Sequence, residues 1–207
     1  MKANEIKILF IKCLLNKFPA SIIGNEVLFS TNQHRTDILQ IMNNKTYAYE
    51  IKSDSDNFED INEQLQNYIE SFDYTYLVVT EKHLNEKINL LDNQVGIYVV
   101  TKNHKIKKIR SAKISKNITK TNLLCFLHKK DLIELLSKKG LNSKSVFELR
   151  WLCEKIALKK IKQKSTDSLI KRYSKLFNLF LHDTSGSNIT IDDLTSLTGN
   201  LYTDKLR

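Results

Sequence analysis

The sequence contains very little proline and glycine and has no long apolar run. Its 207 residues include 1 Pro and 5 Gly, which leaves little room for a flexible linker. No stretch approaches the roughly 20 apolar residues that a membrane-spanning helix requires. Residues 5–18 carry apolar side chains at helical spacing with lysines between them, which predicts a packing helix and not a signal peptide. We therefore expect a cytoplasmic protein without a membrane partner.

Cysteine and histidine are too scattered to form the common metal or disulfide frameworks. Cys13, Cys125 and Cys153 are odd in number and far apart, so neither a disulfide framework nor a zinc knuckle is expected. The 5 histidines show no H-x-x-x-H spacing, and no G-x-x-x-x-G-K-[ST] loop is present. A zinc enzyme and an ATP-driven motor are therefore not expected.

Positive charge is abundant and concentrated in the second half of the chain. Residues 1–110 hold 14 Lys and Arg against 14 Asp and Glu, whereas residues 111–207 hold 19 against 9. This half is therefore predicted to contact phosphates in a salt-sensitive way, without reading bases. The residues predicted to bind DNA are Lys129, Lys130, Lys138, Lys139, Lys159, Lys160, Lys162, Lys164, Lys171 and Arg172. The competing interpretation is a solvated lysine-rich surface, because Lys outnumbers Arg 28 to 5, as AT-rich coding also produces.

Two segments in the first half predict a β-hairpin that carries charged side chains. Residues 35–42 and 46–52 alternate and contain β-branched and aromatic residues, with Asn43-Asn44 between them. Because strand side chains alternate, Glu50 and Lys52 project from the same face. An antiparallel neighbour can bring Asp37 beside Glu50, so two carboxylates and an ammonium group are predicted to converge.

Two carboxylates beside an amine are typical of a site that acts on a phosphodiester. Asp37 and Glu50 are oxygen ligands of the kind that Mg²⁺ prefers, and one of the waters on the ion can serve as the nucleophile. Lys52 either orients or activates that water, or neutralises the developing charge. The sequence leaves these roles open. The competing interpretation is that a Glu-x-Lys pair is only the solvated face of a strand.

An amphipathic helix is predicted after the hairpin. Asp56 is expected to be its N-cap with Glu59 three residues later. The apolar stripe consists of Ile61, Leu65, Tyr68, Ile69 and Phe72. Gln64 and Tyr68 are four residues apart, so an amide and a phenol border this stripe within reach of a phosphate or a metal-bound water. The alternative is an ordinary polar flank of the helix.

Together these residues resemble the PD-(D/E)XK, or restriction-endonuclease-like, nuclease superfamily. The pattern is Asp37, then Glu50-Ile51-Lys52, then Gln64-Leu65-Gln66-Asn67-Tyr68, which is similar to the Q-x-x-x-Y motif of RecB-like and lambda-exonuclease-like members. Over residues 26 to 73 the chain also resembles a group of small uncharacterised nuclease-like proteins of bacteria and phages. One departure is Thr36, which stands where the superfamily motif has Pro.

The resemblance implies an α-β-β-β-α-β core and assigns roles to single residues. Asp37 and Glu50 would bind Mg²⁺ or Mn²⁺ with the backbone carbonyl of Ile51, and Lys52 would be the catalytic lysine. Glu26 matches an acidic position that supplies a further metal ligand.

The remaining pattern predicts an α/β fold: a mixed β-sheet flanked by helices, with an α-helical C-terminal extension. Strands are expected at 74–80 and 96–101 and an edge strand at 105–110, with a helical segment near 81–91. Helices are expected at 123–139 ending at Gly140, after a Ser145–Glu148 capping box, at 166–182, and at 191–201. Trp151 and the aromatic residues of these helices are expected to be core residues. We assign residues 1–112 to the nuclease-like core and 113–207 to the basic extension.

The expected function is a metal-dependent nuclease that hydrolyses DNA. Two alternatives remain open. One is a catalytically inert nucleic-acid-binding or adaptor protein on the same fold, and the other is a nuclease for RNA or for branched substrates. A homodimer would suit the cutting of both strands, although no heptad or interface pattern predicts one.

Overall fold

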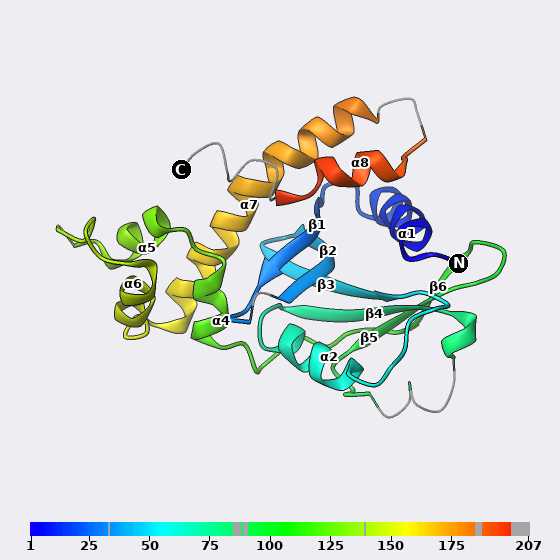
Figure 1. The fold of residues 1–207 in the computed structure, drawn as a ribbon, viewed down its shortest axis with the longest axis horizontal. Coiled ribbons are helices and arrows are strands. Elements are labelled where there is room, and N and C mark those ends of the chain that lie inside the picture. The colour runs from blue at the N-terminus through cyan, green and yellow to red at the C-terminus, as the bar shows by residue number, and fades with distance from the viewer. Residues whose placement is uncertain (33, 85–87, 89–90, 139, 185–187, 200–207) are drawn as a thin grey trace.

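The computed structural model describes residues 1–32, 34–84, 88, 91–138, 140–184 and 188–199. It confirms the expected α/β fold, a mixed sheet flanked by helices and followed by a helical C-terminal region (Figure 1). The elements are α1 (Ala3–Lys17), β1 (Ile22–Phe29), β2 (His34–Met42), β3 (Lys45–Lys52), α2 (Ile61–Ile69), β4 (Tyr74–Thr80), η1 (Glu81–His83), β5 (Gly96–Val100), β6 (Ile106–Arg110), α4 (Lys120–Cys125), α5 (Lys129–Leu136), α6 (Val146–Cys153), α7 (Leu158–Asp183) and α8 (Ile191–Ser196). The first six follow the order α-β-β-β-α-β.

The six strands lie in the order β1-β2-β3-β4-β5-β6. Strands β1, β2 and β3 are antiparallel, β3 to β5 are parallel, and β6 is an antiparallel edge strand. The predicted hairpin is confirmed, with Ile38 opposite Tyr49 and Met42 opposite Lys45. Asn43 and Asn44 have φ of 50° and 58°, and this pair of left-handed residues matches the twist of the flanking strands.

Helices cover both faces of the sheet. In Figure 1, α1 and α8 lie on one side of the strands and α2 lies on the other. Under α1 the buried side chains include Phe10, Tyr49 and Tyr98, whose rings pack edge to face or tilted. Under α2, Leu65 and Leu77 belong to a second apolar cluster. None of the helices in the described part of the chain combines the length and hydropathy needed to cross a membrane.

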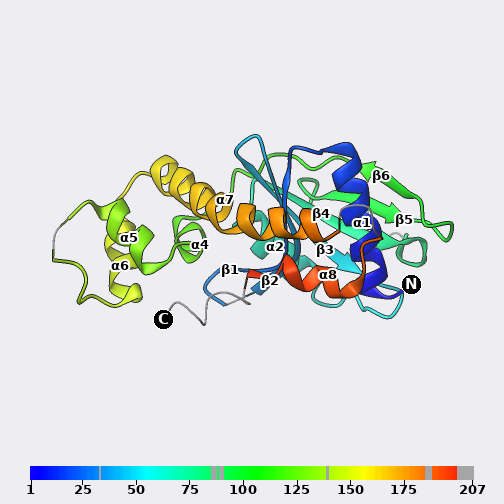
Figure 2. The ribbon, with the colours of Figure 1, turned by 90° about the horizontal axis from the view of Figure 1, so that it is seen from above.

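The C-terminal helices extend the core of the sheet. Helices α4, α5 and α6 and the start of α7 form a lobe, residues 120–164, at one end of the molecule in Figures 1 and 2. The long helix α7 runs from this lobe back to the sheet, where Tyr173 is buried in one cluster with Val27 and Leu39. Farther along α7, Phe177 and Phe180 join the cluster under α1, so the helical region and the sheet share their hydrophobic cores.

Two predicted helix starts and one predicted helix end are wrong. Helix α2 begins at Ile61 after Asp60, because the Asp56 carboxylate instead accepts the backbone N–H of Ser53 at 2.6 Å. The predicted helix 123–139 is two helices, α4 and α5. Helix α5 ends at Leu136, followed by the left-handed C-cap Ser137 with φ of 52°, and not at Gly140. Helix α7 begins at Leu158, eight residues before the predicted start.

Two other predicted helices differ in extent. The segment near 81–91 contains the short 3₁₀ turn η1, while residues 85–87 and 89–90 lie outside the described residues. The last helix, α8, ends at Ser196, and the predicted end at residue 201 lies outside the described residues.

The expectation that Trp151 is a core residue is wrong. Helix α6 buries Leu149 and Cys153, which are four residues apart, and turns its opposite face to solvent. That face carries Phe147, which is 80% exposed, and Trp151, which is 62% exposed. The periodicity of a helix of eight residues does not say which of its two apolar faces is buried.

A buried carboxylate ties helix α7 to the sheet. Asp73 precedes β4 and accepts the backbone N–H of Thr46 at 3.0 Å, and its other oxygen lies 2.5 Å from Lys162 Nζ in α7. Because hydrogen bonds to a charged group are worth about 2 kcal/mol, we expect Asp73→Asn to lower the free energy of unfolding by about that amount. Urea denaturation would measure the loss. The exposed Asp167→Asn, also on α7, should change stability far less.

Candidate active site

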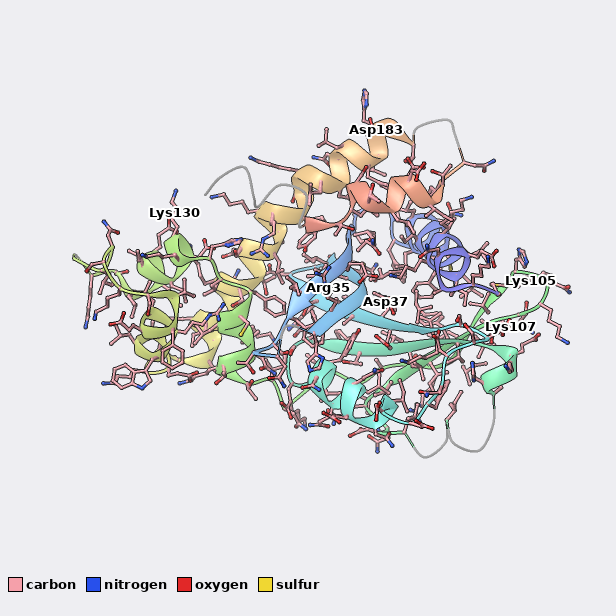
Figure 3. All side chains as sticks on the ribbon, viewed as in Figure 1. Arg35, Asp37, Lys105, Lys107, Lys130 and Asp183 are labelled. Atoms are coloured by element: carbon pink, nitrogen blue, oxygen red, sulfur yellow. The ribbon has the colours of Figure 1, made fainter. Side chains whose placement is uncertain are left out.

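Asp37 lies in β2 (Figure 3), at a point where the pairing of this strand with its neighbours is interrupted according to its register. The pairing of β1 with β2 skips Glu26 and Asp37, and the pairing of β2 with β3 ends at Ile38 and Tyr49. One oxygen of the Asp37 carboxylate accepts the backbone N–H of Ile51 in β3 at 2.8 Å. The carboxylate therefore lies between strands, close to the end of β3 that carries the predicted Glu-x-Lys pair.

Thr36, the departure from the superfamily motif, has a local structural role. Its side chain is buried, and its hydroxyl lies 3.1 Å from the Ile38 carbonyl oxygen and 3.3 Å from that of Tyr49 in β3. A proline at this position has no hydroxyl to offer. Thr36 thus links β2 to β3 beside Asp37, where the backbone pairing has ended.

Four predicted site residues form one chain of polar contacts across β3 and α2. Lys52 Nζ lies 3.1 Å from a Glu50 carboxylate oxygen and donates to the Gln64 side-chain carbonyl at 2.8 Å. The Tyr68 hydroxyl donates to the other Glu50 oxygen at 2.5 Å and lies 3.1 Å from the Arg35 carbonyl oxygen. Glu50 and Lys52 share one face of β3, as their spacing predicts, and α2 presents its amide and its phenol to them.

Lys7 is a site residue that the sequence analysis missed. This α1 side chain is buried, and its ammonium contacts Glu26 and lies 2.9 Å from an Asp37 oxygen. The signal was present in the sequence, because Lys7 occupies a position of the apolar stripe that continues with Phe10, Ile11 and Leu14. A lone charge at a core position of an amphipathic helix indicates a buried partner of opposite charge.

Glu26 has an unusual backbone conformation. Its φ is 51°, in the left-handed region, which costs about 1 kcal/mol for a residue with a β-carbon. Its carboxylate and that of Asp37 both contact Lys7. The structure therefore joins Glu26 to Asp37 through an ammonium group, and the local strain coincides with the interruption in the pairing of β1 with β2.

Burial opposes the charged forms of both predicted metal ligands. It raises the pKa of Asp37, and the positive charge of Lys7 opposes this rise. Burial also raises the pKa of Glu50, and the negative charge of Asp37 adds to the increase. The two carboxylates therefore interact electrostatically. A cation bound between them would relieve both the burial and the repulsion.

The raised pKa of Glu50 predicts how stability depends on pH. A carboxyl whose pKa is higher in the folded state binds its proton more tightly there, so stability falls as pH rises from the ordinary value of 4.5 through the raised one. Glu50→Gln removes this ionisation. In EDTA at neutral pH we expect the variant to be more stable than the wild type. Below pH 4.5, the ordinary pKa of the carboxyl group, this gain in the free energy of unfolding should be lost. Urea denaturation across pH tests this, and an equal gain at every pH would contradict it.

The oxygen donors at this site fit a hard divalent ion. Among the described residues, no group of three or more His, Cys, Asp or Glu side chains is arranged to hold a metal. Asp37 and Glu50, with the backbone carbonyl of Ile51, provide a smaller donor set made only of oxygen. Mg²⁺ is commonly bound by one or two carboxylates while it keeps several waters. This set therefore suits Mg²⁺ or Mn²⁺.

The residues predicted to bind DNA fall into two groups. Those that are exposed are Lys129, Lys130, Lys138, Lys159, Lys160 and Lys171. The others make internal contacts: Lys162 with Asp73, Lys164 with Glu134, and Arg172 with the Phe126 carbonyl. Lys139 lies outside the described residues. Contact with DNA stays a prediction, and the exposed group is its better basis.

Comparison with known proteins identifies the family. The family described as Bacteriophage P4 protein cII matches residues 1–198. The chain belongs to this family. Protein cII of Enterobacteria phage P4 is 30% identical over 206 residues, which cover 95% of this chain and 78% of that protein. The P4 cII match thus includes the sheet, the candidate site and the helical lobe.

This P4 cII family member is also similar to the solved structure of a protein of unknown function from Silicibacter pomeroyi. The two sequences are 14% identical and the structures align with a TM-score of 0.46, over 71% of this chain and 98% of the Silicibacter chain. This likeness is too weak to carry an argument about fold or function.

Proposed function

We propose that this protein is a Mg²⁺- or Mn²⁺-dependent nuclease that hydrolyses phosphodiester bonds of DNA on a restriction-endonuclease-like core. One observation carries the proposal. The half-buried carboxylates of Asp37 in β2 and Glu50 in the adjoining β3 interact electrostatically, and Lys52 Nζ lies 3.1 Å from Glu50. The sequence pattern that predicted this convergence spans two strands and a helix, so chance alone is a poor explanation for the assembled group.

Each residue has a distinct role in this proposal. Asp37, Glu50 and the Ile51 carbonyl would hold the ion, which would supply positive charge at the scissile phosphate and make the attacking water more acidic. Lys52 brings an ammonium group to the same point, where it orients the attacking water or offsets negative charge.

Two further residues hold these groups in position. Gln64 accepts a hydrogen bond from Lys52 and fixes the direction of its Nζ atom. Tyr68 does the same for Glu50, since its hydroxyl donates to one carboxylate oxygen. Both are positioning residues of helix α2. Glu26 acts on Asp37 through Lys7. To bind the ion as a further ligand, the Glu26 carboxylate would have to leave its contact with the Lys7 ammonium.

One observation favours the inert alternative. All four carboxylate oxygens already have partners, because Asp37 contacts Lys7 and the Ile51 N–H while Glu50 contacts Lys52 and Tyr68. A site satisfied in this way is also consistent with a nucleic-acid-binding adaptor that retains the fold without an ion. RNA remains an alternative substrate, since these contacts do not distinguish ribose from deoxyribose.

Metal dependence is the direct test. We expect the purified protein to cleave plasmid, linear duplex or single-stranded DNA when Mg²⁺ or Mn²⁺ is present, and to stop when EDTA is added. Parallel reactions with RNA decide the substrate class, and sedimentation on DNA tests for a dimer. Salt-sensitive DNA binding without cleavage under either metal would favour the adaptor. Cleavage that persists in EDTA would contradict the proposed mechanism.

A further inference from the structure

Two aromatic rings project from the helical lobe, residues 120–164. Phe147 and Trp151 are 80% and 62% exposed, although residues of this size are usually buried or bound to a partner. They are four residues apart on α6, so their β-carbons are about 6 Å from each other on one face of the helix. The opposite face of α6 is anchored in the core by Leu149 and Cys153. The rings are therefore held on a supported helix.

Positive charge surrounds this aromatic pair. The helical lobe contains 12 Lys and Arg against 4 Asp and Glu. The ammonium of Lys155 lies 5.6 Å from the centre of the Trp151 ring, and Lys159 and Lys160 follow in exposed positions at the start of α7. The four acidic residues make contacts inside the lobe: Asp131 and Glu134 with Lys164, Glu148 with Ser145, and Glu154 with Thr121.

We propose that Phe147 and Trp151 stack on bases of a single-stranded nucleic acid while the lysines of the helical lobe contact its phosphates. Single strands expose both a charged backbone and unpaired base faces, and proteins bind them with basic surfaces that carry aromatic rings. The inference rests on the proposed function only in taking nucleic acid as the partner. It adds the strand type and a binding surface that the metal site does not use.

Other occupants fit these features less well. A second copy of the chain would bring two strongly basic lobes together, and like charges oppose such contact. A base-paired duplex offers phosphates, but its base faces are stacked on one another and leave the rings without partners. A membrane-surface helix needs a continuous apolar face. On α6 the second apolar face is already buried in the protein core.

The fluorescence of Trp151 provides a direct assay, because the chain has 1 Trp. The wild-type protein is titrated in EDTA with an oligomer of deoxythymidine and, separately, with a blunt duplex of matched length. We expect the oligomer to quench the emission, salt to reverse the quenching, and the duplex to bind at least about tenfold more weakly. Because no metal is present, a protein that binds strands but never cleaves them supports this inference while contradicting the proposed nuclease.

Substitutions at Phe147 separate stacking from charge. Phe147→Ala should weaken oligomer binding about tenfold, since it removes one ring, while Phe147→Tyr should bind like the wild type. Leu179→Ala, on an exposed part of α7 outside the lobe, is the control and should bind normally. Circular dichroism verifies that each variant is folded.

Several results would overturn the proposal. The first is that the oligomer leaves the Trp151 emission unchanged, the second is that the duplex binds as tightly as the oligomer, and the third is that Phe147→Ala binds the oligomer as tightly as the wild type does. A dimer that Phe147→Ala dissociates in sedimentation experiments would assign the rings to self-association. A response to anionic lipid vesicles alone would assign them to a membrane surface.

Discussion

Lys52→Met is expected to reduce metal-dependent DNA cleavage by about a thousandfold, the usual scale for loss of a positioned catalytic group. The variant keeps the length of the side chain but removes the ammonium group that lies 3.1 Å from Glu50 and donates to Gln64. DNA binding should change little, because the exposed lysines lie elsewhere. Single-turnover cleavage and a separate binding titration in EDTA measure the two effects.

The matched control for this loss is Lys107→Met. Lys107 lies on the exposed edge strand β6, and Figure 3 shows it well away from Asp37. Its substitution removes the same charge and should leave cleavage nearly unchanged. If Lys52→Met cleaves as well as Lys107→Met does, Lys52 is not part of the catalytic machinery and the proposed site is wrong.

A second substitution separates the two roles left open for Lys52. Lys52→Arg keeps the positive charge but introduces a group that stays protonated at any working pH. Substantial activity in this variant would indicate that charge alone is needed. Activity as low as that of Lys52→Met would indicate that the ammonium must orient the water or exchange a proton with it.

Local features of the chain could be predicted from the sequence because neighbouring residues determine them. The hairpin follows from alternating side chains around Asn43-Asn44, and the face shared by Glu50 and Lys52 follows from the period of a strand. Gln64 and Tyr68 lie beside the hairpin because the apolar stripe of α2 turns that face of the helix toward the sheet.

Features that depend on contacts between distant segments were not predictable in this way. Asp56 has the sequence of an N-cap, yet its carboxylate binds the N–H of Ser53 in the folded chain. Trp151 is a large aromatic residue of the kind usually found in a core, yet the helical lobe buries the other face of α6 and leaves Trp151 exposed. Lys7 reaches Asp37 only because α1 packs on the sheet, so its role required the tertiary structure.

Lys7→Met is expected to destabilise the metal-free protein by about 3 kcal/mol, the lower end for breaking a buried ion pair. The substitution leaves the carboxylates of Glu26 and Asp37 without the ammonium that contacts both. Burial already raises the pKa of Asp37, and removal of the opposing charge of Lys7 makes its ionised form still less favourable. Urea denaturation in EDTA measures this loss.

Mg²⁺ should restore more stability to Lys7→Met than it adds to the wild type. In the native protein Lys7 already supplies positive charge to Asp37, so an ion bound at Asp37 and Glu50 must share that carboxylate with an ammonium group. Without the ammonium, the ion meets less electrostatic repulsion and binds more tightly, and binding to the folded state alone raises stability by mass action. Lys17→Met, on the exposed last turn of α1, controls for loss of a charge from the same helix. Equal stabilisation of Lys7→Met and Lys17→Met by Mg²⁺ would show that Lys7 does not oppose the ion, and no response in either protein would indicate that the two carboxylates bind no metal.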